Sequence, residues 1–343
     1  MNPMENRQRL RQMIDGYRQT ALIFAACKLG LPDLLATGPA GVSDLADRLA
    51  VNADALHRLL RGLEVLGIVR AEAGGTHALT ELGAGLVSGA PGASAAAALV
   101  AGEEYAPAWG ALLHSVRTGE AAFDQVFGMD AWEHRQRHSE VGRAFQDWLR
   151  EATDATIAGI VRACDFTDAR VVADVGGGQG GLLAAILREH GHLSGLLIDQ
   201  AHVVGQAGPA LAAAGLGARC RLLAADFFEE LPGGADLYLL KSILHDWDDA
   251  RSVDILRTVR RALSPRARVL IIERPLPERA CDAPATVMQD LHMLAVLGGR
   301  ERAAGHYREL AAAAGLRWRR DLATDAGFVV MEFDRMEPAV ARV

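Results

Sequence analysis

The chain has 343 residues, of which 50% are apolar and 23% charged, which excludes disorder as its main state and leaves room for two domains. Its net charge of −7 argues against a nucleic-acid-binding protein, which normally carries a basic face. Charges or glycines interrupt every long apolar stretch, so neither a membrane span nor a secretory signal is expected. The cysteines form no CxxC pair, which predicts a reducing cytoplasm and no disulfide or zinc framework: Cys27, Cys164, Cys220 and Cys281.

The first hundred residues carry apolar residues at helical spacing. This spacing predicts helices over three segments: 17–35 (with a break at Gly30 and Pro32), 43–49 and 53–66. Ser43 stands where the second helix needs an N-cap. Two short runs around Gly74 and Gly75 predict a hairpin: 68–70 and 76–80. Helices followed by a two-stranded wing are typical of a winged helix-turn-helix.

Residues 90–165 are predicted to be helical and carry many of the chain's bulky aromatic side chains: Tyr105, Trp109, Phe123, Phe127, Trp132, Phe145 and Trp148. For any single ring, packing between helices is the simpler interpretation. So many rings together also fit the wall of a pocket for a flat ligand. Both interpretations stay open at this point.

From residue 169 onward, short β-branched runs alternate with helical segments. Five strands are predicted: 170–175, 196–199, 221–226, 236–240 and 269–273. The alternation indicates an α/β fold with a doubly wound, Rossmann-like parallel sheet, whose ligands bind at the carboxyl ends of the strands. Four acidic residues lie at or near such ends: Asp174, Asp199, Asp226 and Glu273.

The sequence Asp174-Val175-Gly176-Gly177-Gly178-Gln179-Gly180-Gly181 follows the first of these strands and matches GxGxxG. Alone this match is weak, because a turn between a strand and a helix often needs glycine for packing. The ligand could be a dinucleotide or S-adenosylmethionine. The carboxylate of Asp174 favours the second ligand, because it would attract a cationic group and repel a pyrophosphate. Asp199 is placed to accept the ribose hydroxyls, and Asp226 with Phe227 to hold the adenine. A strand-end Asp is more often a helix cap, but three around one crevice favour a site.

The segment Leu239-Leu240-Lys241-Ser242-Ile243-Leu244-His245-Asp246-Trp247-Asp248-Asp249 follows the fourth strand. A neutral imidazole at His245 could take a proton from a hydroxyl if a carboxylate fixed its tautomer. Glu273 and Glu301, the latter in Gly298-Gly299-Arg300-Glu301-Arg302, are candidates for that carboxylate. Metal binding by His245 and the neighbouring aspartates is disfavoured, because consecutive side chains do not converge on one point.

Taken in order, DVGGGQG, Asp199, ADFF, LKSILHDWDD and IIERPLP resemble the caffeic-acid-type O-methyltransferases, in particular those of bacterial antibiotic pathways. The resemblance covers nearly the whole chain. It implies S-adenosylmethionine as methyl donor, S-adenosylhomocysteine as product, no metal, and a homodimer formed through the winged-helix front. It also implies site roles by position: donor binding by Gly176, Gly178, Asp199, Asp226, Phe227 and Lys241; catalysis by His245 with Glu273 and Glu301; acceptor binding by Asp246, Trp148, Leu149 and Met293.

The expected organisation has three parts: a winged-helix dimerisation domain (1–100), a helical linker that contributes to the acceptor pocket (101–165) and a catalytic domain (166–343). The expected activity is methylation of a hydroxyl on a small aromatic or polyketide-type natural product in the cytoplasm. The segment Phe145-Gln146-Asp147-Trp148-Leu149 replaces the Phe-Asn-x-x-Met segment of the plant enzymes. Trp148 is expected to fill or reshape that pocket, which argues against the plant phenylpropanoids as acceptors. Three alternatives remain: a family member with other chemistry, an NAD-dependent oxidoreductase, and a winged-helix ligand-sensing regulator.

Overall fold

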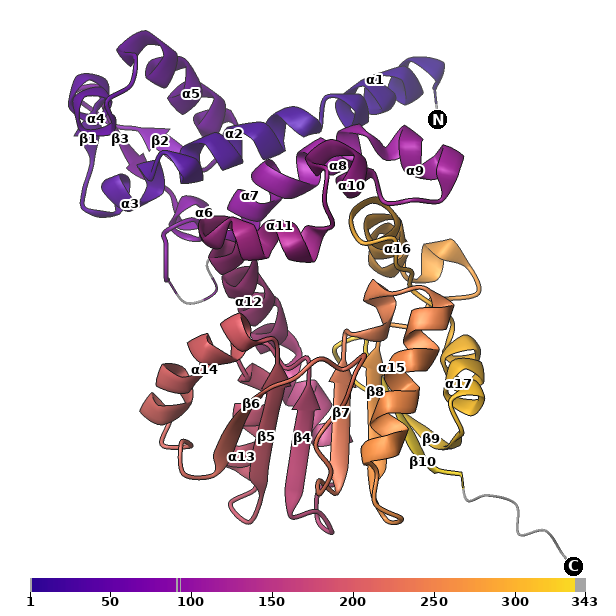
Figure 1. Ribbon diagram of the computed structural model, residues 1–343. Helices are drawn as coiled ribbons and strands as arrows, with labels where there is room; N and C mark the ends of the chain where they lie inside the picture. Colours follow the sequence, from indigo (N-terminus) through magenta and orange to yellow (C-terminus); the bar gives the residue numbers. More distant parts are fainter. Residues whose placement is uncertain (1, 91, 93, 337–343) are drawn as a thin grey trace, which may run out of the picture. The chain divides into compact units, whose positions relative to one another are not determined.

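The structure is a computed structural model that describes residues 2–90, 92 and 94–336 (Figure 1). The chain forms two compact units, of which the first combines Met1–Gly110 with Trp132–Glu151 and the second combines Ala111–Ala131 with Ala152–Val343. The segment expected to be a separate linker, 101–165, is thus divided between the two units. The functional part of that expectation, a contribution to the acceptor pocket, stays a prediction.

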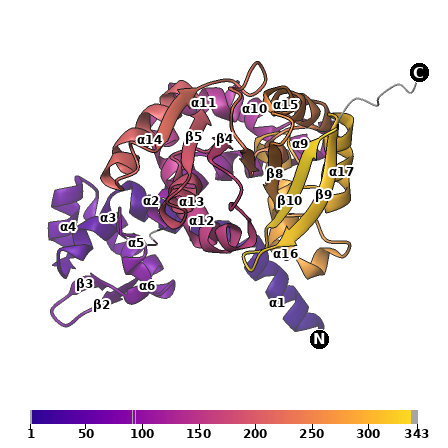
Figure 2. The ribbon, with the colours of Figure 1, turned by 90° about the horizontal axis from the view of Figure 1, so that it is seen from below.

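The first unit begins with the predicted winged-helix arrangement. Its elements are α1 (Pro3–Ile14), α2 (Tyr17–Lys28), α3 (Leu31–Ala36), β1 (Ala40–Gly41), α4 (Val42–Leu49), α5 (Ala53–Val65), β2 (Val69–Ala71), β3 (Thr76–Leu79) and α6 (Glu81–Ala84). The predicted hairpin is present as β2 and β3 (Figure 2). Strand β3 also pairs with the unpredicted strand β1. The predicted cap at Ser43 is wrong: α4 begins one residue earlier, after Gly41, so Ser43 lies within its first turn.

The helices α2 to α5 enclose a small core. Leu45, Leu60 and Leu63 are fully or almost fully buried there, because α4 and α5 each present one apolar face. The helix α5 starts where the side chain of Asn52 accepts a hydrogen bond from the backbone N–H of Ala55, at 2.9 Å. In contrast, α1 buries none of its residues.

The remaining helices of the first unit hold the aromatic residues together around a buried ion pair. They are α7 (Ala95–Val100), the π-helix η1 (Ala101–Tyr105), α8 (Ala106–Gly110), most of α11 (Ala131–Arg137) and the first half of α12 (Ser139–Ala163). Glu104 is fully buried and accepts a hydrogen bond from the guanidinium of Arg135 at 2.7 Å. That guanidinium lies 3.5 Å from the centre of the Phe145 ring, and Phe145 packs beside Trp148. Phe145 and Trp148 thus pack between helices, and a pocket role for the aromatic residues of 90–165 stays a prediction.

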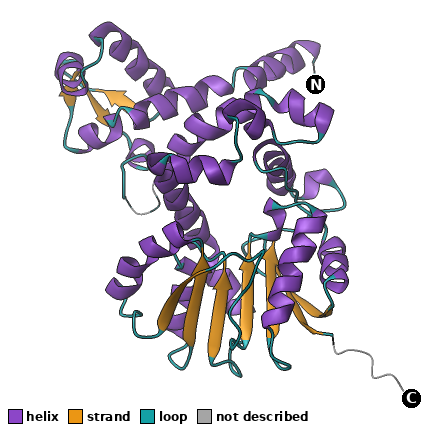
Figure 3. Ribbon diagram, in the orientation of Figure 1, coloured by secondary structure: helices purple, strands orange, loops and turns teal. Residues whose placement is uncertain are grey.

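The second unit contains a seven-stranded sheet in the order β6-β5-β4-β7-β8-β10-β9. Figure 3 draws the strands in orange. Its strands are β4 (Val171–Val175), β5 (Ser194–Asp199), β6 (Cys220–Ala224), β7 (Leu237–Lys241), β8 (Arg268–Glu273), β9 (Leu316–Ala323) and β10 (Val329–Arg335). The five predicted strands, β4 to β8, run parallel to one another. The unpredicted pair β9 and β10 continues the sheet in antiparallel fashion.

Helices cover both faces of this sheet, as a buried parallel sheet requires. Besides the second half of α12, the second unit contains α13 (Gly181–Glu189), α14 (Ala201–Ala213), α15 (Asp249–Ala262), α16 (Pro284–Val296) and α17 (Ala304–Ala313), and the shorter α9 (Leu112–Thr118), α10 (Ala122–Phe127), η2 (Leu244–Asp246) and η3 (Ala280–Asp282). Alternate strand residues divide between two cores, one shared with α15 and α17 and the other with α12, α13 and α14. The helix α16 instead packs against α9 and α10. None of the described helices is long and apolar enough to cross a membrane.

Candidate active site

The glycine-rich loop links β4 to α13 and depends on glycine at specific positions. Gly176 and Gly178 have φ angles of 69° and 57°, in the left-handed region that favours glycine. A Cβ atom at Gly176 would lie 2.4 Å from the side chain of Ile243, which belongs to the segment that carries His245. The loop therefore brings its backbone close to that segment, and a larger residue at Gly176 would be strained and would have to displace the Ile243 side chain.

Asp199 lies at the end of β5 and is bonded to the same loop. Its carboxylate accepts hydrogen bonds from the backbone N–H of Gly178, at 2.8 Å, and of Gln200, at 2.7 Å. These bonds explain Asp199 as a loop anchor. Each carboxylate oxygen keeps a further lone pair, so the predicted contact with ribose hydroxyls stays available.

Asp174 and Lys241 lie on the neighbouring strands β4 and β7. Asp174 is 2% exposed, and its Oδ2 atom has no hydrogen-bond partner, which is costly for a buried oxygen. Burial raises the pKa of Asp174 to about 7, against the opposing charge of Lys241. Burial also lowers the pKa of Lys241, whose Nζ atom donates a hydrogen bond to Thr153 at 3.3 Å. An unpaired buried carboxylate beside the glycine loop fits the amino group of a ligand.

Asp226 and Phe227 follow β6 and take part in a local turn. The Asp226 carboxylate accepts a hydrogen bond from the backbone N–H of Phe228, at 2.8 Å. The Phe227 ring packs edge-on against Trp247, with their centres 6.1 Å apart, and lies near the position of Gly176. The turn alone accounts for the position of Asp226, so its predicted contact with adenine stays a prediction.

His245 lies in η2, immediately beyond the end of β7, and is surrounded by three carboxylates. Its Nδ1 atom is 2.9 Å from Oε1 of Glu301 and 3.5 Å from Oε2 of Glu273. Its Nε2 atom is 3.3 Å from the carboxylate of Asp246. Glu273 is fully buried and Glu301 is 3% exposed. The structure therefore brings together the three residues predicted to carry the chemistry.

The charges around His245 control its basicity. Burial lowers the pKa of His245, but Glu273, Asp246 and Glu301 together outweigh burial and raise it to about 10. Burial raises the pKa of Glu273 to about 7, and the charge of His245 opposes that rise. An imidazole in this position accepts a proton readily, and the carboxylates stabilise the resulting cation.

One oxygen of Glu273 also fixes the backbone that carries His245. Glu273 Oε1 accepts hydrogen bonds from the backbone N–H groups of Ile243 and Leu244, at 3.1 and 2.9 Å. Ser242 precedes them with a φ of 55°, a left-handed conformation that is uncommon for a residue with a side chain. A strained turn of this kind is typical of functional sites.

The same three side chains, those of His245, Glu273 and Glu301, offer atoms that lie within 4.8 Å of one another, close enough to surround a metal ion. The hydrogen bonds oppose that use. The Nδ1 atom must carry a hydrogen to bond to Glu301, and a protonated nitrogen cannot ligate a metal. The arrangement therefore fits proton transfer better than metal binding.

The residues predicted to contact the acceptor are spread over both units. Asp246 lies beside His245, and Met293 is buried in α16 of the second unit. Trp148 and Leu149 belong to the first unit, where Trp148 packs against Tyr105 and Phe145. Their contact with an acceptor stays a prediction.

Several residues of the site are ones that the sequence analysis did not single out. Thr153 contacts Lys241, Asp290 accepts a hydrogen bond from the backbone N–H of Glu301 at 2.9 Å, and Arg302 is buried beneath the His245 loop. Only the position of Arg302 next to Glu301 could have drawn attention to it. Nothing in the local pattern separates it from a surface arginine.

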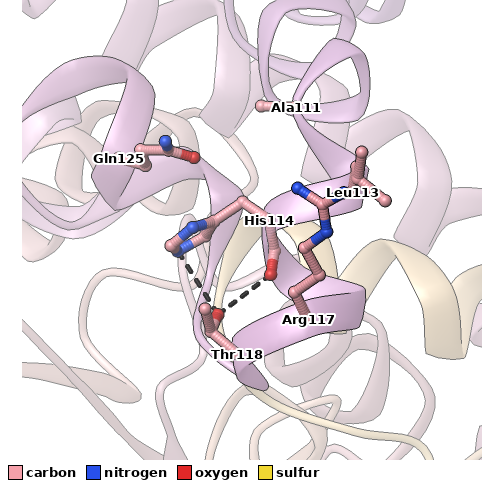
Figure 4. A pocket seen from close by; sticks show the side chains of 6 residues that line it. All are labelled: Ala111, Leu113, His114, Arg117, Thr118 and Gln125. Carbon is pink, nitrogen blue, oxygen red and sulfur yellow. Dashed lines mark hydrogen bonds between the residues drawn. The ribbon is translucent and has the colours of Figure 1, made fainter.

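A separate hollow lies on the surface of α9 and α10 (Figure 4). It is lined by Ala111, Leu113, His114, Arg117, Thr118 and Gln125. The Thr118 hydroxyl donates a hydrogen bond to the His114 carbonyl at 3.0 Å, a local helix contact. None of the predicted site residues lines this hollow, so it is not the candidate active site.

Comparison with known families agrees with this fold. Residues 11–89 match the O-methyltransferase dimerisation domain, and residues 109–317 match the O-methyltransferase domain. The chain therefore belongs to the O-methyltransferase family. The family, the fold class and the O-methyltransferase activity predicted from the sequence are confirmed.

Individual relatives cover almost the full chain. Phenazine O-methyltransferase PhzM of Lysobacter antibioticus is 40% identical over 323 residues, which are 94% of either chain. The crystal structure of LaPhzM has a TM-score of 0.92 and 39% identity over 98% of this chain and 100% of that one. NcsB1, an O-methyltransferase from neocarzinostatin biosynthesis, has a TM-score of 0.82 and 31% identity, covering 93% of this chain and 96% of that one. It was solved with S-adenosylmethionine and 2-hydroxy-5-methyl naphthoic acid, so the predicted cofactor is confirmed for the family.

One relative carries a different activity in its name. Aclacinomycin 10-hydroxylase RdmB of Streptomyces purpurascens is 35% identical over 296 residues, which are 85% of this chain and 79% of that protein. RdmB is therefore an example of a related protein whose name gives an activity other than methyl transfer. A test of function has to distinguish methyl transfer from hydroxylation.

Proposed function

We propose that this enzyme transfers a methyl group from S-adenosylmethionine to a phenolic hydroxyl of a small, planar aromatic or polyketide-type natural product, with His245 as general base. The observation that carries the proposal is the contact of His245 Nδ1 with Glu301 and Glu273, at 2.9 and 3.5 Å. Such a contact fixes the imidazole orientation and leaves Nε2 to accept the proton of an acceptor hydroxyl.

The residues at the carboxyl edge of the sheet fit the donor. The loop of Gly176 and Gly178 admits a ligand close to its backbone, Asp199 keeps lone pairs for hydroxyls, and Asp174 has an unpaired oxygen for an amino group. When bound, S-adenosylmethionine supplies a methyl group that its sulfonium charge already makes electrophilic. The protein's own part is to hold the acceptor in line and to remove its proton.

Proton removal is well matched to a phenol. A phenol has a pKa of ~10, and the carboxylates around His245 raise the imidazole pKa to about 10. The O–H bond of the acceptor breaks, its proton passes to Nε2, and the electron pair stays on oxygen to form the new O–methyl bond. Glu301 and Glu273 stabilise the imidazolium, and Asp246, 3.3 Å from Nε2, is placed to accept a neighbouring polar hydrogen of the acceptor.

The test compares His245→Ala with His192→Ala. His192 precedes β5 at the opposite edge of the sheet, where its ring contacts the Phe166 carbonyl, so it serves as a matched control. Removing the base should lower kcat by roughly 10²–10⁴-fold, as general-base loss does, while calorimetric affinity for S-adenosylhomocysteine stays within about twofold because no donor contact is lost. Unchanged turnover in His245→Ala would show that the base is another group.

The acceptor panel should contain phenols and hydroxylated naphthoic acids, including 2-hydroxy-5-methyl naphthoic acid, with products analysed by mass spectrometry. A gain of one methylene shows methyl transfer, whereas a gain of one oxygen shows a hydroxylase. Binding of NADH in place of S-adenosylhomocysteine would favour an oxidoreductase. A gel shift on random DNA duplex at low salt would favour a regulator.

We also infer that the chain forms a homodimer through residues 11–89, which match the O-methyltransferase dimerisation domain. We further infer that the enzyme acts in the cytoplasm. Support for the homodimer comes from α1, on which Leu10, Met13 and Ile14 are 59–70% exposed although they are apolar. Exposed apolar side chains of this kind are typical of a protein interface. Light scattering should give twice the chain mass for the wild type and a lower mass for Ile14→Glu, and a monomeric wild type would contradict the inference.

A further inference from the structure

Arg302 is 1% exposed and directly follows Glu301, the residue in contact with His245. Its guanidinium reaches both sides of His245. Nη1 donates a hydrogen bond to the Leu244 carbonyl at 2.9 Å, and Nη2 donates one to the Trp247 carbonyl at 2.7 Å. One planar group therefore spans the turn that carries the proposed base.

A carboxylate balances the charge of Arg302. Nε of Arg302 donates a hydrogen bond to Oδ1 of Asp249 at 2.9 Å, and Asp249 is the first residue of α15. The Asp249 side chain is 42% exposed, so one partner of this ion pair remains in contact with water. The pair ties the far end of the 244–249 turn to the segment 299–302.

The two segments also meet through their backbones. The N–H of Arg300 donates a hydrogen bond to the His245 carbonyl at 2.8 Å. A Cβ atom at Gly299 would lie 2.2 Å from that same carbonyl oxygen, so only glycine permits the approach. Segment 299–302 consequently lies flat against the 244–249 turn and carries Glu301 to His245.

We propose that Arg302 is a positioning residue for methyl transfer: its guanidinium holds the 244–249 turn against segment 299–302 and thereby keeps His245 in contact with Glu301. This inference rests on the proposed function of His245 as the base. Arg302 touches neither donor nor acceptor in this role, and it acts through the backbone on both sides of His245.

The fork shape of the guanidinium is what the geometry uses. Arginine presents five N–H donors in a fixed plane, whereas lysine presents a compact point charge. The guanidinium bonds to four acceptors, which are the carbonyls of Leu244, Trp247 and Arg300 and the carboxylate of Asp249. A lysine ammonium could not reach all four. An ion pair that served only the stability of the fold would not need hydrogen bonds to the carbonyls on both sides of His245. Well-packed apolar residues often stabilise a fold as much as a buried ion pair does.

The experiment compares Arg302→Lys, Arg302→Met and Gly299→Ala with Arg268→Met as a matched control. Arg268 pairs with Glu332 at 2.7 Å and lies at the opposite end of β8 from Glu273, so its loss affects stability away from the site. Two readouts are used in each variant: kcat and KM for a phenol that the wild type methylates, and the imidazole titration of His245 by NMR in the S-adenosylhomocysteine complex. His245→Ala assigns the resonance.

In the Arg302 and Gly299 variants, kcat should fall by about tenfold to a hundredfold, since a misplacement of ~1 Å costs that much. KM for S-adenosylmethionine should stay within about twofold, because the donor contacts are intact. The pKa of His245 should fall from its raised value toward that of a free imidazole as the carboxylates move away. Arg268→Met should leave kcat and the His245 titration unchanged.

An equal loss of kcat in Arg302→Met and Arg268→Met, or an unchanged His245 titration in the Arg302 variants, would overturn the proposal. If Arg302→Met does not fold, Asp249→Ala and Gly299→Ala take its place and should show both a lowered kcat and a shifted His245 titration. If neither variant shows both effects, the proposal is overturned. The titration needs no acceptor. The two proposals can therefore fail separately. If the His245 titration shifts in the Arg302 variants while His245→Ala keeps its turnover, Arg302 positions His245 but His245 is not the base.

Discussion

Nδ1 of His245 and Oε1 of Glu301 lie 2.9 Å apart although 56 positions separate these residues in the chain. The contact arises because the backbone at Gly299 packs directly on the carbonyl of His245. A carboxylate at Nδ1 favours the tautomer with its hydrogen on that nitrogen. Nε2 is then the ring nitrogen that can receive a proton, and the role of His245 follows from the position of Glu301.

Neutralising Glu301 should lower turnover. In Glu301→Gln the amide can still accept a hydrogen bond, but it no longer stabilises an imidazolium. A hydrogen bond to a charged group contributes about 1.5–3 kcal/mol, so kcat should fall by roughly tenfold to a hundredfold. Glu309→Gln, on the exposed side of α17, is the control and should behave as wild type. If kcat is the same in both variants, Glu301 does not assist the base.

The rate should rise with pH. The carboxylates around His245 outweigh burial and raise the pKa of its imidazole to about 10, so below that pH the folded protein mostly holds the protonated form. A general base acts in its unprotonated form, and kcat/KM should therefore increase from pH 7 to 10. The measurement is kcat/KM over this range with a phenol that the wild type accepts. A flat or falling profile would contradict the assignment of His245 as base.

Most of the parallel sheet could be predicted from sequence because β4, β5, β7 and β8 are largely apolar runs that are buried on both faces. The antiparallel strands β9 and β10 escaped prediction for a physical reason. In β9 four of the eight residues are charged and most side chains are exposed, so the run lacks the apolar pattern of a central strand. Its pairing with β10 instead involves ion pairs such as Arg317 with Asp334.

The site divides in the same way. His245, Glu273 and Asp199 were predictable because Asp199 and Glu273 end recognisable strands and His245 follows one, and strand ends converge at one edge of a parallel sheet. Arg302 was not, because its role depends on which carbonyls lie above it, and no local pattern encodes them. The cap at Ser43 failed because Gly41 lets the helix begin one residue before the expected capping side chain.

Removing the Asp199 carboxylate should weaken donor binding. In Asp199→Ala the proposed bonds to ribose hydroxyls and the anchor of Gly178 are both lost. The expected cost of about 1.5–3 kcal/mol corresponds to a roughly tenfold to hundredfold lower affinity for S-adenosylhomocysteine by calorimetry. Asp236→Ala is the control, since its carboxylate bonds to Arg170 and Val171 at the opposite edge of the sheet. Equal affinities in the two variants would place the ribose elsewhere.

Asp174 should lower the stability of the free protein at neutral and alkaline pH. Burial raises its folded-state pKa from 3.8 to about 7. The folded state then binds the Asp174 proton more tightly than the unfolded state does. The stability that this proton contributes is fully present below pH 3.8 and is lost as the pH rises through about 7. At 1.36 kcal/mol per unit of pKa difference, the loss amounts to about 4 kcal/mol.

Asp174→Asn removes this titration and should therefore raise the free energy of unfolding at pH 8 by up to about 4 kcal/mol, with a gain that shrinks as the pH is lowered to 5. The same change removes the charge proposed to hold the donor amino group, so affinity for S-adenosylhomocysteine should fall as stability rises. Urea denaturation at the two pH values and calorimetry measure both effects. Asp254→Asn, on the exposed face of α15, should change neither. If Asp174→Asn is less stable than wild type at pH 8, the carboxylate stabilises the fold through contacts with its neighbours. If Asp174→Asn is more stable but binds S-adenosylhomocysteine as tightly as wild type, Asp174 is not part of the donor site.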